Sequence, residues 1–281
     1  MKNKSKILAA PPLIWLILFF LLPLLIIVFY SFLQRGVYGE LVYQFTLSNY
    51  VRLGESIYTQ ILLDTLSVSI LTTLLTLFIS YPLAYYISTL SQSKQQIWLL
   101  LVMLPFWINF LIRSFAWIII LRSQGIVNSL FIHLEWIDQP LSLLYNDGAV
   151  LLGMVYSLLP FMVLPLYISF EKLDRSHLEA ASDLGANSFK VFMHIIVPLT
   201  SKGIIIGSVL VFVSSIGMFV VPDVMGGAKS MLLGNLIQNQ FLSARDWPFG
   251  SSASILLILF SFVLMLLYYY AAARSKGGAK P

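Results

Sequence analysis

The sequence contains no cysteine, and only 10% of its 281 residues are charged. The missing cysteine excludes disulfide bonds, thiolate metal sites and cysteine nucleophiles. A soluble domain carries roughly 25% charged residues, so this chain cannot build an ordinary water-facing surface. Apolar side chains are abundant instead, at 59% of the residues. The composition therefore predicts a protein that lies mostly in a lipid bilayer.

Motifs for catalysis, metal binding and nucleotide binding are also missing from the sequence. No two of the three histidines, His133, His177 and His194, have the helical spacing of a zinc-binding pair. There is no G-x-x-x-x-G-K-[ST] phosphate loop, no H-E-x-x-H motif and no serine, histidine and carboxylate set at workable positions. We expect a chain that is not an enzyme and that binds no metal, cofactor or nucleic acid of its own.

Long apolar runs predict six membrane-spanning helices, and they lack the alternation of barrel strands. The fold class expected is therefore an all-α polytopic membrane protein with one transmembrane domain over residues 1–281. The first run follows a basic start but exceeds the 7–15 residues of a signal-peptide core, so we expect an uncleaved span. The predicted spans are approximately 7–33, 63–90, 97–121, 148–170, 200–222 and 250–273.

The distribution of lysine and arginine predicts that both termini face the cytoplasm. With that orientation, the cytoplasmic segments carry Lys2, Lys4, Lys6, Lys94, Lys172, Arg175, Lys190, Lys202, Arg274, Lys276 and Lys280. The outer segments carry only Arg35, Arg52, Arg122, Lys229 and Arg245. The 171–199 segment is then the one long cytoplasmic loop.

This 171–199 loop has the pattern of two short helices joined by a glycine turn. Ser176 and Glu179 have the spacing of a capping box, Gly185 can end the first helix, and Asn187 can cap a second. Pro198 is expected to break the chain before the fifth span.

Phe189 and Phe192 would leave the second helix with an apolar face that needs a partner. The residues alone allow two interpretations: an elbow that lies on lipid or under its own helix bundle, and a docking surface for another protein.

Residues 179–198 resemble the signature loop E-A-A-x3-G-x9-I-x-L-P of the integral membrane permeases of ATP-binding-cassette importers. Val197 stands where leucine is usual and keeps an apolar side chain there. The residues that match are Glu179, Ala180, Ala181, Gly185, Ile195 and Pro198. The resemblance implies the MetI-like fold of type I importers and a coupling helix that sits in a cleft of a separate ATPase subunit. It assigns coupling to these residues together with Asp183, Phe189 and Phe192, and it leaves ATP and Mg²⁺ to the partner.

Four segments, 104–117, 158–174, 223–241 and 245–254, are similar to the B-component permeases of spermidine/putrescine importers. This resemblance implies a second homologous permease, two ATPase copies and a periplasmic or extracytoplasmic polyamine-binding protein in an inner membrane. Importers of opines, ferric ion, thiamine or sulfate share the fold and are the alternatives. A secondary transporter working alone is less favoured, because it would not need the E-A-A loop.

Acidic and aromatic residues near span ends are candidate contacts for a cationic substrate. Asp64 is expected to open the second span, Asp223 to close the fifth, and Asp246 adjoins Trp247. An ammonium group can pair with a carboxylate and rest on an aromatic face. Helix capping and loop ion pairs are the alternative for these acids. Packing is the alternative for the other aromatic candidates, Trp107 and Tyr156.

Arg113 falls within the predicted third span. A charge there costs about 2.5–3.5 kcal/mol on insertion scales, so we expect it to face the bundle. The expected partner is Asn109 or an acid from another span. A positive charge repels a polyamine, so a structural or gating role is preferred to direct binding.

Overall fold

The computed structural model describes residues 11–174, 176–183, 185–227 and 230–277. In these residues, six stretches are long and apolar enough to cross a membrane, which matches the predicted number. They are Pro11–Ser31, Ser56–Thr89, Phe110–His133, Asp147–Glu171, Ser188–Ile216 and Trp247–Leu266. The predicted start of the first span, at residue 7, lies outside the described residues.

The chain divides into two compact units, Met1–Leu63 with Leu233–Phe262 and Asp64–Leu232 with Val263–Pro281. The first unit contains η1 (Ile17–Leu21), α2 (Leu22–Ser31), β1 (Gln34–Arg35), β2 (Leu41–Val42), α3 (Ser48–Leu53), the start of α4 (Ser56–Thr89), α12 (Leu233–Leu242) and the first part of α13 (Trp247–Gly277). The strands pair antiparallel with Gln34 opposite Val42. Its core packs Phe249 and Ala253 of α13 against Leu53 of α3.

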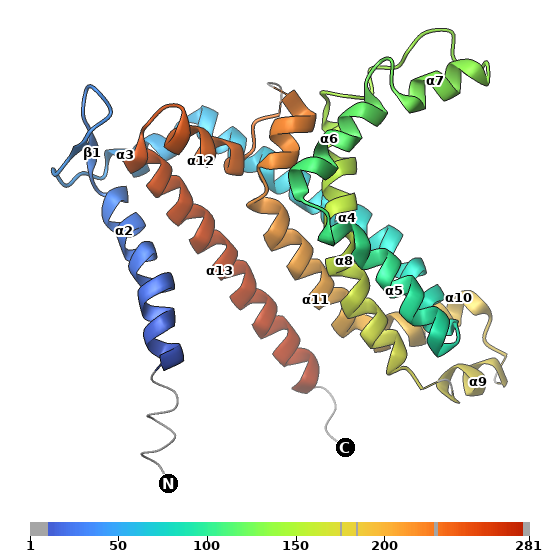
Figure 1. The fold of residues 1–281 in the computed structure, drawn as a ribbon. Helices are drawn as coiled ribbons and strands as arrows, with labels where there is room; N and C mark the ends of the chain where they lie inside the picture. The colour runs from blue at the N-terminus through green and yellow to red at the C-terminus, as the bar shows by residue number, and fades with distance from the viewer. Residues whose placement is uncertain (1–10, 175, 184, 228–229, 278–281) are drawn as a thin grey trace. The chain divides into compact units, whose positions relative to one another are not determined.

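The second unit is built around two long helices, α8 (Asp147–Glu171) and α11 (Val197–Ile216), which run side by side (Figure 1). It also contains most of α4, α5 (Gln92–Trp107), α6 (Phe110–Leu121), α7 (Ile126–His133), α9 (Ser176–Asp183), α10 (Ser188–Val191), η2 (Phe192–Ile196) and η3 (Pro222–Gly226). Glycines allow the close approach: a β-carbon at Gly203 would lie 2.6 Å from the Pro165 carbonyl oxygen of α8. A β-carbon at Gly207 would lie 2.6 Å from the Met162 sulfur.

The stretch 97–121, predicted as one span, is two helices. The α5 helix ends at Trp107, Ile108 adopts extended angles (φ −77°, ψ 136°), and α6 begins at Phe110. The Asn109 side chain accepts a hydrogen bond from the Leu111 amide (2.9 Å) and so caps α6. Twelve residues of α6 extend only about 18 Å, less than the roughly 30 Å of a bilayer core. The single-helix prediction was therefore wrong, because apolar composition does not reveal a cap inside an apolar run.

Two π-helical turns, η1 and η2, each end two residues before a proline. The amides of Leu22 and Val197 bond five residues back, to the carbonyls of Ile17 and Phe192. Pro23 and Pro198 then lie in the first turn of α2 and α11. A proline ring collides with the carbonyl four residues before it in a regular α-helix, and the wider turn relieves that collision.

The helix consequently continues through Pro198, from Ser188 to Ile216. The predicted break at Pro198 was wrong, and so was the start of the fifth span at residue 200. The second span likewise begins earlier than predicted, at Ser56, so Asp64 lies inside α4 and does not open it.

Candidate functional site

The two helices predicted in the 171–199 loop are present, as α9 and α10, at one end of the α8–α11 pair (Figure 1). Asp174 accepts a hydrogen bond from the Ser176 amide (3.0 Å) where α9 begins. Gly185 has a left-handed φ of +78°, and the Ala186 amide bonds back to the Ala181 carbonyl (3.0 Å). This six-to-one bond past a left-handed residue is a Schellman motif, which ends α9 and turns the chain.

Asn187 caps α10 as predicted, because its side-chain oxygen accepts a hydrogen bond from the Lys190 amide (2.9 Å). Leu178, Ala181 and Ala186 then pack against a core formed by α4, α5, α8 and α11. We call residues 176–196, which span α9, the Gly185 turn, α10 and η2, the coupling segment. Its inner side is anchored in the core of the second unit.

The motif residues divide between the inner and outer sides of the coupling segment. Phe189 is 68% exposed, and Asp183 and Gly185 are also exposed. Ile195 packs against the core, and Phe192 meets the Tyr81 ring edge to face at 5.6 Å. The side chains of Glu179 and Ala180 lie outside the described residues. Phe189 therefore offers an apolar contact to a partner, whereas Phe192 and Ile195 hold the segment in place.

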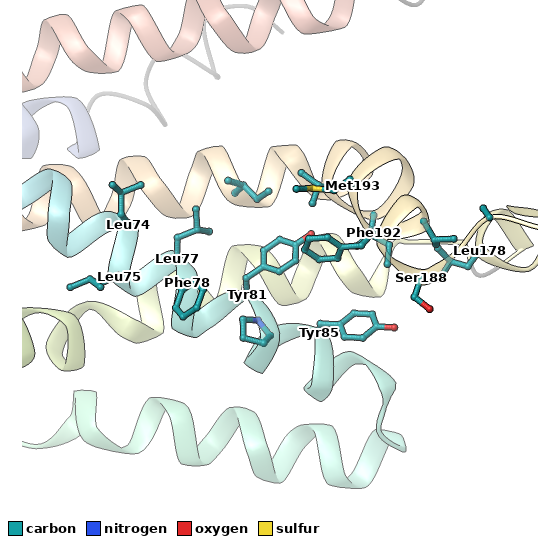
Figure 2. Close-up of a pocket in the computed structure, with 16 residues that line it drawn as sticks. Leu74, Leu75, Leu77, Phe78, Tyr81, Tyr85, Leu178, Ser188, Phe192 and Met193 are labelled. Carbon is teal, nitrogen blue, oxygen red and sulfur yellow. The ribbon is translucent and has the colours of Figure 1, made fainter. Parts of the chain in front are cut away.

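An apolar groove of about 1170 Å³ is lined by α4, the coupling segment and the start of α11 (Figure 2). Leu74, Phe78 and Tyr81 line one wall, and Phe192 and Met193 line the other. Tyr81 crosses the groove, since its hydroxyl shares a hydrogen bond with the Thr200 hydroxyl (2.9 Å). The coupling segment thus borders an open groove, and its Phe192 ring contacts Tyr81 of α4.

Arg113 is buried, with 8% of its surface exposed, and it spans the break between α5 and α6. Its Nη1 donates to the Pro105 carbonyl oxygen (2.8 Å), near the C-terminal end of α5. Its guanidinium carbon lies 4.9 Å from the centre of the Phe110 ring and 5.8 Å from that of Tyr156 on α8. The expected partner was wrong: the Asn109 side chain caps α6, and no acid forms an ion pair with Arg113 in the described part of the chain.

In the first unit, Asp246 forms an ion pair with Arg52 (2.8 Å) and also accepts from the Phe249 amide (3.2 Å). The Arg52 guanidinium stacks over the Phe249 ring at 4.0 Å and donates to the Tyr58 hydroxyl (3.0 Å). Asp246 is buried, so its carboxylate is committed to ordering the start of α13. This geometry favours the structural alternative over a substrate contact at Asp246.

The comparisons with known proteins agree with this architecture. Residues 5–277 match the family described as "Binding-protein-dependent transport system inner membrane component". The chain belongs to this family. It is a multi-pass inner membrane protein and a component of an ATP-binding-cassette transport system.

Among curated relatives of this transport component are spermidine/putrescine transport system permease proteins PotB. The protein from Salmonella typhimurium is 44% identical over 262 residues, covering 92% of this chain and 91% of that one. The protein from Escherichia coli K12 is 45% identical over 245 residues, covering 87% and 89%. The protein from Haemophilus influenzae is 44% identical over 241 residues, covering 86% and 84%.

Among solved structures, a bacterial transporter that imports the acidic polysaccharide alginate has a chain that superposes with a TM-score of 0.74. The match covers 97% of this chain and 96% of that chain at 16% identity, so it shows the fold alone. The predicted MetI-like permease fold is thereby confirmed.

The other candidate residues of this transport component are scattered. Trp107 is 70% exposed beside the helix break, and Tyr156 is half-buried on α8. Asp223 is exposed in η3, Asp64 is exposed on α4, and Trp247 is 45% exposed at the start of α13. Their roles as substrate contacts stay predictions.

Sequence reasoning missed the specific contacts of Arg52 and Gln95. Arg52 was counted only as a loop charge, although it lies over Phe249 and holds Asp246. Gln95 of α5 accepts from the Tyr167 hydroxyl of α8 (3.0 Å), and it donates to the Ser88 and Leu90 carbonyls. The Arg52–Asp246 and Gln95–Tyr167 contacts join positions far apart in the sequence, so no local pattern could reveal them.

Proposed function

We propose that this chain is the polyamine permease subunit of an ATP-driven importer and forms half of the translocation pathway for spermidine and putrescine. The observation that carries the proposal is identity of 44–45% to PotB proteins over about nine-tenths of both chains. Because that similarity extends over most of the chain, it supports a shared substrate class better than a match of the coupling segment would. Importers for opines, ferric ion, thiamine or sulfate are not favoured.

We further propose that the coupling segment docks on a separate ATPase, which binds ATP and Mg²⁺, so that this subunit is itself non-catalytic. The exposed Phe189 and the Gly185 turn that ends α9 support a docking role. Two ATPase copies, a second homologous permease and a polyamine-binding protein complete the proposed importer. The lysine and arginine distribution supports cytoplasmic termini and a cytoplasmic coupling segment.

Nucleotide-driven closure of the ATPase would move the coupling segment and shift the helices between two access states. Because this segment packs on α4, α8 and α11 at once, its motion would be transmitted to all three.

Uptake into vesicles that carry all the subunits tests the substrate. We expect ATP-dependent, receptor-dependent accumulation of labelled spermidine or putrescine, and background uptake when ATP is omitted. Accumulation of an opine, ferric ion, thiamine or sulfate in place of polyamines would contradict the proposal.

A further inference from the structure

The surroundings of Arg113 have the composition of a binding site for an organic cation. The Pro105 carbonyl oxygen accepts from its Nη1 at 2.8 Å, and the rings of Phe110 and Tyr156 lie 4.9 and 5.8 Å from its guanidinium carbon. Trp117 meets the Tyr156 ring edge-on at 5.4 Å and helps to fix it. Carbonyl oxygens at a helix C-terminus and aromatic faces both favour positive charge. We call Pro105, Phe110 and Tyr156 the cation cage.

Arg113 lacks a counter-ion in the cage, which is unusual for a buried arginine in an apolar span. No carboxylate pairs with Arg113 among the residues that the structure describes, and its buried Nε has no hydrogen-bond partner among them. The site therefore holds one positive charge and has no counter-charge to accommodate a second. Without the guanidinium, the carbonyl oxygen and the ring faces that remain favour a cation over an anion.

We propose that the cation cage is an ammonium-binding site of the transport pathway, and that Arg113 occupies it as a tethered cation in this conformation. The inference rests on the proposed polyamine substrate. Exchange of the guanidinium for a substrate ammonium leaves the local charge unchanged, whereas both cations together would repel each other strongly at low dielectric. Arg113 and substrate thus exclude each other.

This exchange would also change the helix break. Arg113 joins α6 to the end of α5, so its departure releases the tie to Pro105 and leaves the Ile108–Asn109 connection free to bend. Trp107 and Ile108, which are 70% and 43% exposed, lie beside the break. Entry of an ammonium group is thereby linked to the conformation of the broken span.

The first test asks whether the cage binds cations at all, independently of transport. In the purified importer carrying Arg113→Ala, we expect ethylguanidinium to raise the unfolding midpoint saturably, and its neutral analogue ethylurea to have no effect. Adding Tyr156→Leu should abolish the response. Adding Phe115→Leu, which changes an exposed ring on α6, should preserve it. An equal response to ethylguanidinium and ethylurea, or none to either, would overturn the proposal.

The second test connects the cage to substrate. We expect putrescine to stabilise the Arg113→Ala importer without its binding protein at concentrations roughly tenfold below those needed for wild type, because the tethered competitor is gone. If Arg113→Ala does not assemble, Arg113→Gln removes the charge and retains a donor for the Pro105 carbonyl, and a smaller shift in the same direction is expected. The substrate site would be refuted if ethylguanidinium stabilises the variant but putrescine stabilises the variant and the wild type at equal concentrations. Failure of the polyamine proposal alone would leave the ethylguanidinium response intact.

Discussion

Gly185 shows how one backbone angle can end a helix and turn the chain. A side chain there would meet no atom within 4 Å, so the constraint is its φ of +78° and not the available space. Asparagine tolerates this conformation, other residues lose about 1–2 kcal/mol, and proline cannot adopt it. We expect Gly185→Asn to retain substrate-stimulated ATPase activity in the purified importer and Gly185→Pro to lose it. A proline variant with wild-type stimulation and a retained ATPase subunit would contradict the coupling role.

We predict that the Asp246 side chain stabilises the folded protein. Asp246→Ala removes hydrogen bonds to Arg52 and to the Phe249 amide, and we expect a loss of about 1–3 kcal/mol, measured by denaturant unfolding. Glu55→Ala, which changes an exposed acid in the same unit, should stay within about 0.5 kcal/mol. If Asp246→Ala is as stable as wild type and fails only in transport, a substrate role would be favoured instead.

The Arg52 pKa determines how the stability contributed by Arg52 depends on pH. Burial alone lowers this pKa, but hydrogen bonds to Asp246 and Tyr58 raise it overall above its ordinary value. A raised pKa gives stability that is complete below the unfolded-state pKa and is lost only as the pH rises through the folded-state pKa. Both values lie far above neutral pH, so the Arg52 contribution should be constant across the physiological range.

At the scale of elements, the contact between α8 and α11 depends on small residues. The β-carbon of Gly203→Ala would lie 2.6 Å from the Pro165 carbonyl oxygen, and backbone cannot move aside as a flexible side chain can. We expect a loss of about 1–3 kcal/mol and a lower unfolding midpoint in detergent. Gly217→Ala is the matched control, because a β-carbon there meets nothing within 4 Å. Equal midpoints for the two variants would show that the helices can separate at little cost.

The elements also show what local sequence can and cannot reveal. The helix, glycine turn and helix of the coupling segment were predicted, because Gly185 and Asn187 act through their own backbone and nearest neighbours. The break at Ile108 and the continuity through Pro198 were not. The break depends on the Asn109 cap of α6, and the continuity depends on a hydrogen bond to the carbonyl five residues back instead of four. The sequence is compatible with a regular helix and with either of these arrangements. The partner of Arg113 was predicted wrongly for a related reason. Its guanidinium binds the Pro105 carbonyl near the end of α5, and the sequence did not reveal that α5 ends there.

At the scale of the whole molecule, two substitutions in the coupling segment should affect folding and assembly separately. Phe189→Glu changes a 68% exposed ring, so we expect normal insertion and unfolding of the subunit but loss of the ATPase during affinity purification. Phe192→Ala should do the opposite and destabilise the subunit, because that ring packs on Tyr81. Retention of the ATPase by Phe189→Glu would place the docking contact elsewhere on the chain.

The π-turn before Pro198 sets the rotational phase between the coupling segment and the fifth span. One residue of an α-helix corresponds to about 100° of rotation and 1.5 Å of rise. The extra residue in Phe192–Ile196 therefore turns Phe189 about a quarter of the way around the helix axis, compared with a regular α-helix of the same length. A regular α-helix there would restore the collision with the Pro198 ring and would move Phe192 away from its contact with Tyr81. The proline thus fixes which way the coupling segment faces.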